Sequence, residues 1–421
     1  MLGVVDMMML GRVGAPEMAA ATLGNVILMG ITVPLMGLLM GADPILSQSF
    51  GAGDSKRIAR TLQSTLLLLP LASLPIFIVG FFAPELLRFF GQPEHLIPLA
   101  KSYIWINLPS LPLYLGFGVL RQWLQARGIV KPAMWVMLFA NIVNVFANWV
   151  LIFGNLGAPA MGLEGSAIGT LVTRSTMVLI LLAWIRKASL GSGAWLPWAR
   201  ESFCWERQAA ILKLGWGIAA SFAVEMWGFY AVALIAGRLG ERELAGHGLV
   251  MNVVSLVFMV PIGLSIASSI RVGNLIGARD PEGAQRTAYI ALGLTIAVMA
   301  TVSLTFVIFR QQLPLIFSKE PELVAIAASL FPIAAVFQIF DGVQGVCGGI
   351  LRGMGQTRAP ALAHAMGLYA LGLPFGWYLL HRGEPKLTDI WWGLCAGLLV
   401  VAALLALLVI RRGPRTVRAL A

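Results

Sequence analysis

The sequence predicts an all-α integral membrane protein with twelve transmembrane helices in two pseudo-symmetric six-helix lobes. The first observation is the composition: 58% of the 421 residues are hydrophobic and only 12% are charged, whereas soluble domains have about 25% charged residues. The second is that the apolar residues form runs long enough to cross a bilayer, which takes about 20 residues of helix. The third is an internal repeat, by which the second half of the chain resembles the first.

The twelve spans follow from these apolar runs. The first is short at its amino end, which indicates a first helix that is truncated or a start that is misassigned. Prolines inside several spans, such as Pro109 in the fourth, predict kinks because proline lacks a backbone donor. The spans are predicted near residues 1–11, 18–49, 61–88, 100–125, 132–154, 163–185, 211–237, 244–276, 287–310, 322–352, 359–381 and 389–410.

A repeat with one constant offset divides the chain into two halves. Residues 11–14 match residues 237–240, and residues 51–54 match residues 277–280, each pair 226 residues apart. A single offset over this length indicates an internal duplication. Because each half holds an even number of spans, both halves enter the membrane in the same orientation. This architecture is typical of transporters that bind cargo between the repeats.

We expect an N-terminal lobe over residues 1–187 and a C-terminal lobe with a basic tail over residues 211–421. Residues 188–210 are polar and rich in tryptophan, which predicts an interlobe cytoplasmic linker at the level of the lipid headgroups. The loops after even-numbered spans, with the tail, carry about two-thirds of the 30 Lys and Arg residues, and loops rich in them face the cytoplasm. We therefore expect a multi-pass protein of a bacterial-type inner (plasma) membrane, with both termini cytoplasmic.

Two acidic residues lie near the middle of predicted spans. Asp341 is the only charged residue from Leu323 to Ile350, and Glu225 lies at the centre of the seventh span. A carboxylate at mid-bilayer costs roughly 2.5–3.5 kcal/mol on insertion scales, so such residues usually mark an ion or substrate site. We predict that Glu225 and Asp341 form a cation-binding, coupling site that holds Na⁺ through oxygen ligands or shares a proton. The structural alternative is hydrogen bonding between helices.

The first lobe offers a second candidate, a proton or polar site at Asp6, Asn144 and Asn148. The two asparagines are four residues apart and therefore share one helix face, although hydrogen bonding between helices explains them nearly as well. Arg174 lies within the sixth span, where we expect it to snorkel or to pair with an acid. We interpret His364 as a neutral, hydrogen-bonded side chain rather than a proton carrier.

Other function classes find little support in the sequence. It has no GxxxxGK[ST] loop for ATP phosphates and no spacing of catalytic or metal-binding residues, so we expect a protein that is not an enzyme and needs no cofactor beyond its coupling ion. The net charge is +11, and the basic residues lie in short loops between apolar runs. Membrane topology explains this distribution better than nucleic-acid binding does. The three distant cysteines predict no disulfide framework. We expect a monomer.

Short stretches along nearly the whole chain resemble the multidrug and toxic compound extrusion (MATE) transporters, in particular their NorM-like branch. The resemblance implies export of organic cations in exchange for Na⁺ or H⁺, with Glu225 and Asp341 in the cation site. It also implies a polar site at Asp6, Asn144 and Asn148, which is proton-linked in some relatives. Some relatives have an acid at the position of Asn148. Because this chain lacks that acid, Glu225 and Asp341 are favoured as the coupling site. The matching stretches are Val5-Asp6 with Gly11-Arg12, residues 48–53, Asn144 and Asn148 before Gly154, Glu225, residues 245–247 with Asn252, residues 270–273, and residues 338–344 leading to residues 351–353.

We therefore expect a secondary active antiporter that exports small cationic or amphipathic molecules and drugs by alternating access, surrounded by membrane lipids. The alternative is a flippase of a related fold for a lipid or polysaccharide precursor. A flippase would need basic residues inside the spans, and few are present. A scaffold or receptor that transports nothing would leave the midspan acids and the repeat unexplained.

Overall fold

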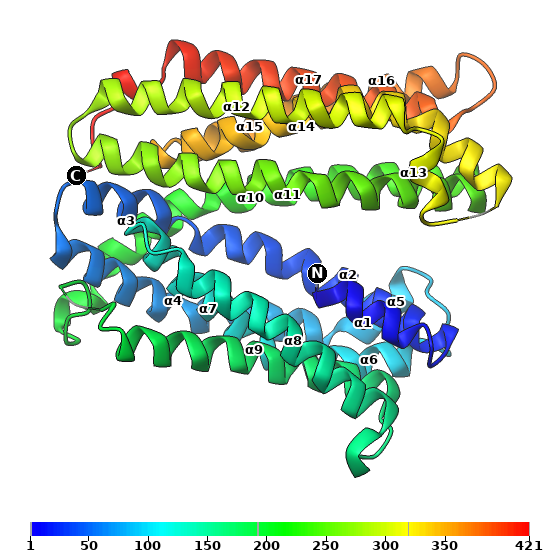
Figure 1. Cartoon of the computed structure of the whole chain (residues 1–421), viewed down its shortest axis with the longest axis horizontal. Helices are drawn as coiled ribbons and strands as arrows, with labels where there is room; N and C mark the ends of the chain where they lie inside the picture. Colours follow the sequence, from blue (N-terminus) through cyan, green and yellow to red (C-terminus); the bar gives the residue numbers. More distant parts are fainter. Residues whose placement is uncertain (1, 192, 319, 421) are drawn as a thin grey trace. The chain divides into compact units, whose positions relative to one another are not determined.

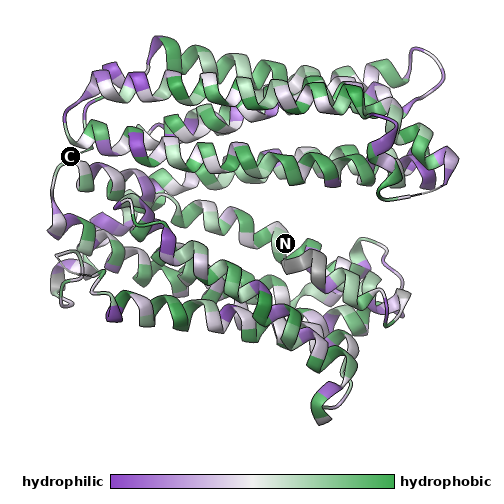
Figure 2. Ribbon diagram, in the orientation of Figure 1, coloured by the Kyte–Doolittle hydropathy of each residue, from purple (hydrophilic) through white to green (hydrophobic). Residues whose placement is uncertain are grey.

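The computed structural model describes residues 2–191, 193–318 and 320–420, in which helices and loops occur without strands. Met1, the predicted start of the first lobe, lies outside these residues, as do Ser192 in the predicted linker, Lys319 and Ala421. Within the described ranges, nine helices and one bent helix pair are long and apolar enough to cross a membrane. Hydrophilic residues lie mainly in the loops and at the helix ends (Figure 2). The predicted all-α membrane class is confirmed.

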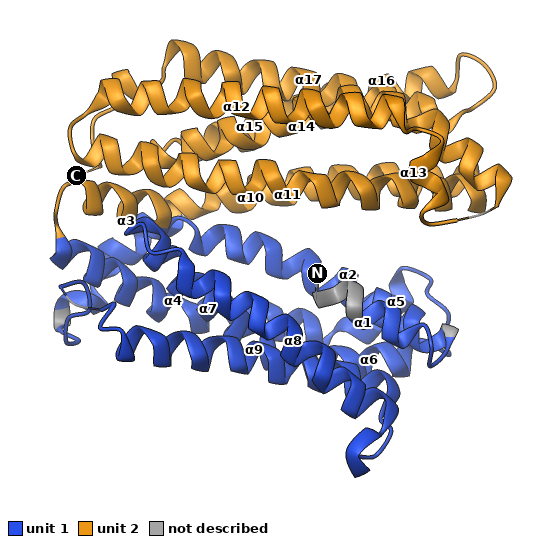
Figure 3. Ribbon diagram, viewed as in Figure 1, with its two compact units in different colours: residues 1–42, 55–212 blue, residues 43–54, 213–421 orange. Residues whose placement is uncertain are grey.

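The chain forms two compact units (Figure 3). Unit 1 comprises residues 1–42 and 55–212, and unit 2 comprises residues 43–54 and 213–421. This division differs from the predicted lobes in two places: the linker packs with unit 1, and residues 43–54 pack with unit 2. Contacts between distant parts of the chain cause the second difference. Gln48, for example, donates to the carbonyl of Gly353, 305 residues away.

Unit 1 is a bundle whose helices lie lengthwise beside one another (Figure 1). The predicted third span, residues 61–88, is divided between α4 and α5. The predicted fourth span is the bent pair α6 and α7, with an angle of 43° at the break next to Pro109, as proline predicts. The elements are α1 (Leu2–Leu10), α2 (Ala15–Leu39), α4 (Ser55–Phe81), α5 (Ala83–Phe89), α6 (Ile97–Asn107), α7 (Ser110–Ala126), α8 (Lys131–Phe153), η1 (Asn155–Gly157), α9 (Gly162–Lys187), η2 (Arg200–Phe203) and the start of α10.

In unit 2, α14 is the central helix and packs against α11, α12 and α17. Phe331 and Phe337 on α14 and Trp391 on α17 are fully buried, and the rings of Phe337 and Trp391 lie 5.9 Å apart. The eleventh predicted span contains a π-helix, η3, a helix type that often occurs at functional sites. The elements are α3 (Ala42–Gly51), α10 (Trp205–Leu239), α11 (Glu241–Gly277), α12 (Pro281–Ile308), α13 (Gln312–Leu315), α14 (Pro321–Gly353), α15 (Arg358–His364), η3 (Ala365–Gly372), α16 (Leu373–Leu380), α17 (Leu387–Arg411) and η4 (Pro414–Thr416).

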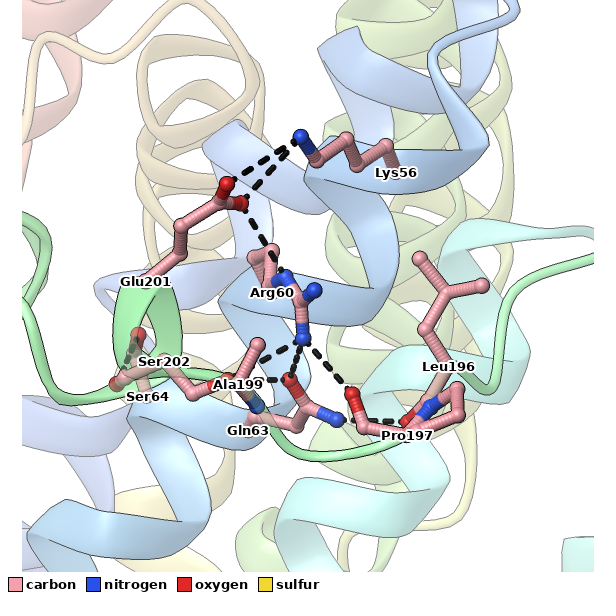
Figure 4. Close-up of polar contacts among 9 residues, drawn as sticks. All are labelled: Lys56, Arg60, Gln63, Ser64, Leu196, Pro197, Ala199, Glu201 and Ser202. Atoms are coloured by element: carbon pink, nitrogen blue, oxygen red, sulfur yellow. Dashed lines mark hydrogen bonds and ion pairs between the residues drawn. The ribbon is translucent and has the colours of Figure 1, made fainter.

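The linker is bound to the first turns of α4 (Figure 4). Arg60 is only 7% exposed, and its Nη1 donates to the carbonyl of Pro197 at 2.8 Å and to Gln63 Oε1 at 2.9 Å. The hydroxyl of Ser202 donates to the same Gln63 oxygen at 2.6 Å. These bonds give partners to one nitrogen of a buried guanidinium and to several polar groups of the linker, so this part of the linker is an ordered segment of unit 1.

An exposed acid completes the attachment. Glu201 lies 3.2 Å from Lys56 Nζ and 3.4 Å from Arg60 Nε. The hydrogen bond from Lys56 and its positive charge lower the pKa of the Glu201 carboxyl. Helix α10 then begins at Trp205, so the last residues of the predicted linker, up to residue 210, are helical.

Candidate cation site

The two midspan acids lie close together in unit 2, joined by one amide. Asp341 on α14 is 3% exposed, and Gln344 follows it by three residues, so both lie on one helix face. The Gln344 amide nitrogen donates to Asp341 Oδ1 at 3.1 Å and to Glu225 Oε1, on α10, at 2.8 Å. The structure therefore brings Glu225 and Asp341 into one hydrogen-bonded group.

His364, the last residue of α15, forms the other side of this group. Its Nε2 lies 2.8 Å from Gln344 Oε1 and 3.8 Å from Glu225 Oε2. Its Nδ1 lies 2.7 Å from the carbonyl oxygen of Pro360 and 3.1 Å from the hydroxyl of Ser221. The ring is 2% exposed, and η3 begins at the next residue. The expected hydrogen bonding of His364 is present.

The contacts of His364 are compatible with a neutral ring. Gln344 directs its nitrogen at two carboxylate oxygens, so its oxygen faces His364 Nε2. Nδ1 faces the carbonyl of Pro360, which can only accept, and the hydroxyl of Ser221, which can donate. A neutral imidazole that donates from Nε2 and accepts from Ser221 at Nδ1 fits Gln344 and Ser221. The neutral form of His364 stays a prediction.

Asp6 and Asn148 of the predicted first-lobe site lie together in unit 1. The Asn148 amide nitrogen donates to Asp6 Oδ1 at 2.5 Å, and Asp6 is 4% exposed. The hydroxyl of Thr170 on α9 donates to Asp6 Oδ2 at 3.5 Å. Asn144 is buried and near enough to Asp6 to interact with it, but its amide makes no hydrogen bond of ordinary length and angle among the described residues. The structure thus adds Thr170 to the predicted set.

Arg174 has a neutral hydrogen-bond partner. Its Nη1 donates to the hydroxyl of Ser110 at 2.6 Å, and its guanidinium lies over the ring of Tyr114, 5.2 Å from the centroid. Asp6 is near enough to interact with it electrostatically. The arginine therefore remains inside unit 1, one helical turn beyond Thr170.

Some of these partners had a signal in the sequence and others had none. Gln344 lies three residues after Asp341, so the helical period places both on one face. Ser221 and His364 lie on other helices, and their contacts join residues 143 apart in sequence. No local pattern predicts such a contact.

The sequence model of the MatE family matches residues 1–150 and 218–378. The chain belongs to the MatE family. Among curated proteins, a probable multidrug resistance protein NorM of Mesorhizobium japonicum is 35% identical over 97% of this chain and 89% of that protein. A multidrug and toxin extrusion protein 1 of Xenopus tropicalis is 29% identical over 94% of this chain and 68% of that protein. The predicted resemblance to MATE transporters is confirmed.

Solved MATE structures share the fold. The crystal structure of the eukaryotic MATE transporter AtDTX14 has a TM-score of 0.89 at 23% identity, covering 98% of this chain and 93% of that chain. An outward-facing MATE family transporter of the MOP superfamily has a TM-score of 0.87 at 20% identity, covering 98% and 91%. Because these sequence identities are below 25%, the similarity shows a shared fold alone. The shared fold agrees with the predicted twelve-helix architecture.

Proposed function

We propose that this MatE family member is a secondary active antiporter that exports organic cations and other drug-like molecules in exchange for Na⁺ or H⁺. The observation that carries the proposal is the hydrogen-bonded group in unit 2, in which Gln344 joins the partly buried carboxylate of Glu225 to the buried carboxylate of Asp341. The names of the relatives, multidrug resistance protein and multidrug and toxin extrusion protein, support the choice of cargo.

The chemistry follows from the charges of this group. Two carboxylates in a low-dielectric interior repel each other, and each is costly to bury without a cation or a proton. An entering cation meets the Gln344 nitrogen between the two acids, so the amide must turn before its oxygen can join the carboxylate oxygens as a ligand. That turn removes the acceptor from His364 Nε2, so cation entry must rearrange the contact between Gln344 and His364.

Transport follows if this neutralisation favours one arrangement of the protein and cargo binding favours another, because a ligand shifts a conformational equilibrium only by its differential affinity. The membrane potential adds about 2.3 kcal/mol per charge for each 100 mV. We place both termini in the cytoplasm because the basic loops lie on that side. We further propose a monomer in a bacterial-type inner membrane that contacts lipids along its apolar helices, without enzymatic activity and without a resident cofactor.

The test is dye efflux from proteoliposomes under Na⁺ and pH gradients that are imposed separately. We expect the wild type to export a fluorescent organic cation under at least one gradient. Glu225→Gln and Asp341→Asn should each abolish gradient-driven export. Glu384→Gln, which changes an exposed acid, serves as the matched control and should leave export unchanged. Full export by both site variants would refute the mechanism.

A further inference from the structure

A groove lies on one face of α9 in unit 1, at the helix end where the linker begins. Its volume is about 430 Å³, and it is lined by Ile180, Ala183, Trp184, Lys187 and Ala188. Ligand sites in proteins have volumes of about 300–1,000 Å³. The lining residues recur at intervals of three and four, so they share one face of the helix. We call this surface the α9 groove.

The groove faces away from the helices that pack against α9. Those helices are α6, α7 and α8 (Figure 1), and the side of α9 that enters the bundle carries the buried residues Met177, Leu181 and Ile185. Ala183 and Lys187, by contrast, are exposed. Helix α9 is long and apolar enough to cross a membrane, and exposed apolar surface on such a helix is suited to contact with lipid.

The length of α9 places the groove at the level of the lipid headgroups. A helix of 26 residues is about 39 Å long, whereas the hydrocarbon core of a bilayer is about 30 Å thick. The last turn, which carries Arg186 and Lys187, therefore reaches the headgroups. Trp184 lies one turn before the helix ends, and tryptophan is enriched at this level. Ile180 lies deeper, on the hydrocarbon side.

The cations of the last turn are not needed to cap the helix. Basic side chains near a helix end can bind its last carbonyls, but here backbone groups do so. The carbonyl of Trp184 accepts from the backbone N–H of Ala188 at 2.9 Å. The carbonyl of Ile185 accepts from that of Leu190 at 3.0 Å. Among the described residues, no acid or carbonyl pairs with the Lys187 ammonium, so this charge is available to a ligand.

The charge of the groove rim is positive. The end of a helix carries about half a negative elementary charge, which the two cations Arg186 and Lys187 outweigh. The chain directly after the rim is also held in place. Arg127 on α7 donates to the carbonyl of Leu190, and its guanidinium lies 4.8 Å from the centroid of the Trp123 ring. A rim that is already ordered reduces the entropy lost when a ligand binds.

We propose that the α9 groove binds one anionic phospholipid. Its phosphate meets Lys187, with Arg186 beside it, and one acyl chain lies along Ile180 and Ala183. The positive rim favours an anionic headgroup over a zwitterionic one, and the apolar lining favours a lipid over a free phosphate ion. The bound lipid stabilises the protein by mass action. This inference does not depend on the transport activity proposed above.

Native mass spectrometry of the full-length protein in detergent tests the headgroup preference. Dioleoyl phosphatidylglycerol and dioleoyl phosphatidylcholine are supplied in equal amounts. We expect the wild type to retain the anionic lipid over the other by about fivefold or more, because each basic residue near the headgroups changes affinity by about that factor. Lys187→Gln should lower this preference by about fivefold. Lys213→Gln, which changes an exposed lysine on α10, is the matched control and should leave it unchanged.

Two results of this measurement would overturn the proposal. The first is equal retention of the two lipids by the wild type, which would mean that the surface holds lipid or detergent without regard to charge. The second is an equal loss of preference in Lys187→Gln and Lys213→Gln, which would mean that the preference comes from the overall charge of the protein.

Filling the groove tests the site of the acyl chain. Ala183→Leu should reduce the rise in melting temperature that phosphatidylglycerol gives the wild type, whereas Ala297→Leu, which enlarges an exposed alanine on α12, should keep the full rise. Melting temperatures without lipid check that both variants fold. Inorganic phosphate alone should give no rise. A full rise in Ala183→Leu, or a full rise of the wild type with phosphate alone, would overturn the proposal.

Discussion

Gln344 donates a hydrogen bond of 2.8 Å to Glu225, which lies 119 residues earlier in the sequence. The same nitrogen lies 3.1 Å from Asp341, so one neutral amide bridges a buried acid and a partly buried one. The coupling that we propose requires groups whose charge can be neutralised by an ion, and these two acids are such groups in unit 2.

Replacing the bridging amide should weaken cation coupling. Hydrogen bonds to charged groups contribute about 1.5–3 kcal/mol each, so we expect Gln344→Leu to lower gradient-driven dye export by about tenfold to a hundredfold. The control is Gln338→Leu on the same helix, since Gln338 is equally buried but donates to a backbone carbonyl, that of Val254. Equal loss in both variants would mean that the effect is structural.

In unit 1, the bond between Asn148 and Asp6 should contribute to stability. Asn148→Leu leaves a buried carboxylate with one fewer donor, and we expect the free energy of unfolding to fall by about 1–3 kcal/mol. Asn141→Leu is the matched control on α8, because Asn141 donates only to the carbonyl of Met137, one turn away. Thermal unfolding in detergent compares the two variants. If Asn141→Leu were destabilised while Asn148→Leu unfolded like the wild type, the stabilising role that we give to Asn148 would be wrong.

The attachment of the linker should depend on Arg60 more than on Lys56. Arg60→Met removes buried hydrogen bonds to Gln63, Pro197 and Ser202, so we expect a loss of about 1.5–3 kcal/mol in the free energy of unfolding. Lys56→Met removes an exposed ion pair, which typically contributes little. Melting temperatures measured side by side check this order, and a larger effect at Lys56 would contradict it.

The ion pairs of Glu201 should respond to pH in one direction. Because the pKa of its carboxyl is lowered in the folded protein, the stabilisation is present above the ordinary carboxyl pKa and is lost as pH falls through the lowered value. We expect a small difference in melting temperature between the wild type and Glu201→Gln at neutral pH, which vanishes on acidification. A difference that grows on acidification would show the opposite sign.

The fold was largely predictable because its determinants are local in the sequence. Long apolar runs define the spans, and Pro109 marks the break in the fourth. The docking of α3 into unit 2 was not predictable, since it depends on Gln48 contacting Gly353 and Leu420, more than 300 residues away. The early start of α10 at Trp205 was missed because the polar, tryptophan-rich composition of this stretch gives no clear helical end.

The candidate site likewise has residues that the sequence could predict and contacts that it could not. Glu225 and Asp341 stand out because a lone charge in an apolar span is conspicuous at any position. The contacts of His364 with Gln344 and with Ser221 depend on how separate helices pack against one another. No local pattern in the sequence supplies that information, so the sequence could suggest hydrogen bonding of His364 but not its partners.

The most direct test of the central claim reverses the exchange. A dye gradient is imposed across proteoliposomes without an ion gradient, and Na⁺ flux and internal pH are followed together. If Glu225 and Asp341 bind the coupling ion, the wild type will drive Na⁺ or H⁺ against the direction of dye movement, and the combined Glu225→Gln and Asp341→Asn variant will drive neither. Dye-driven ion movement at the wild-type rate in that variant would contradict the account.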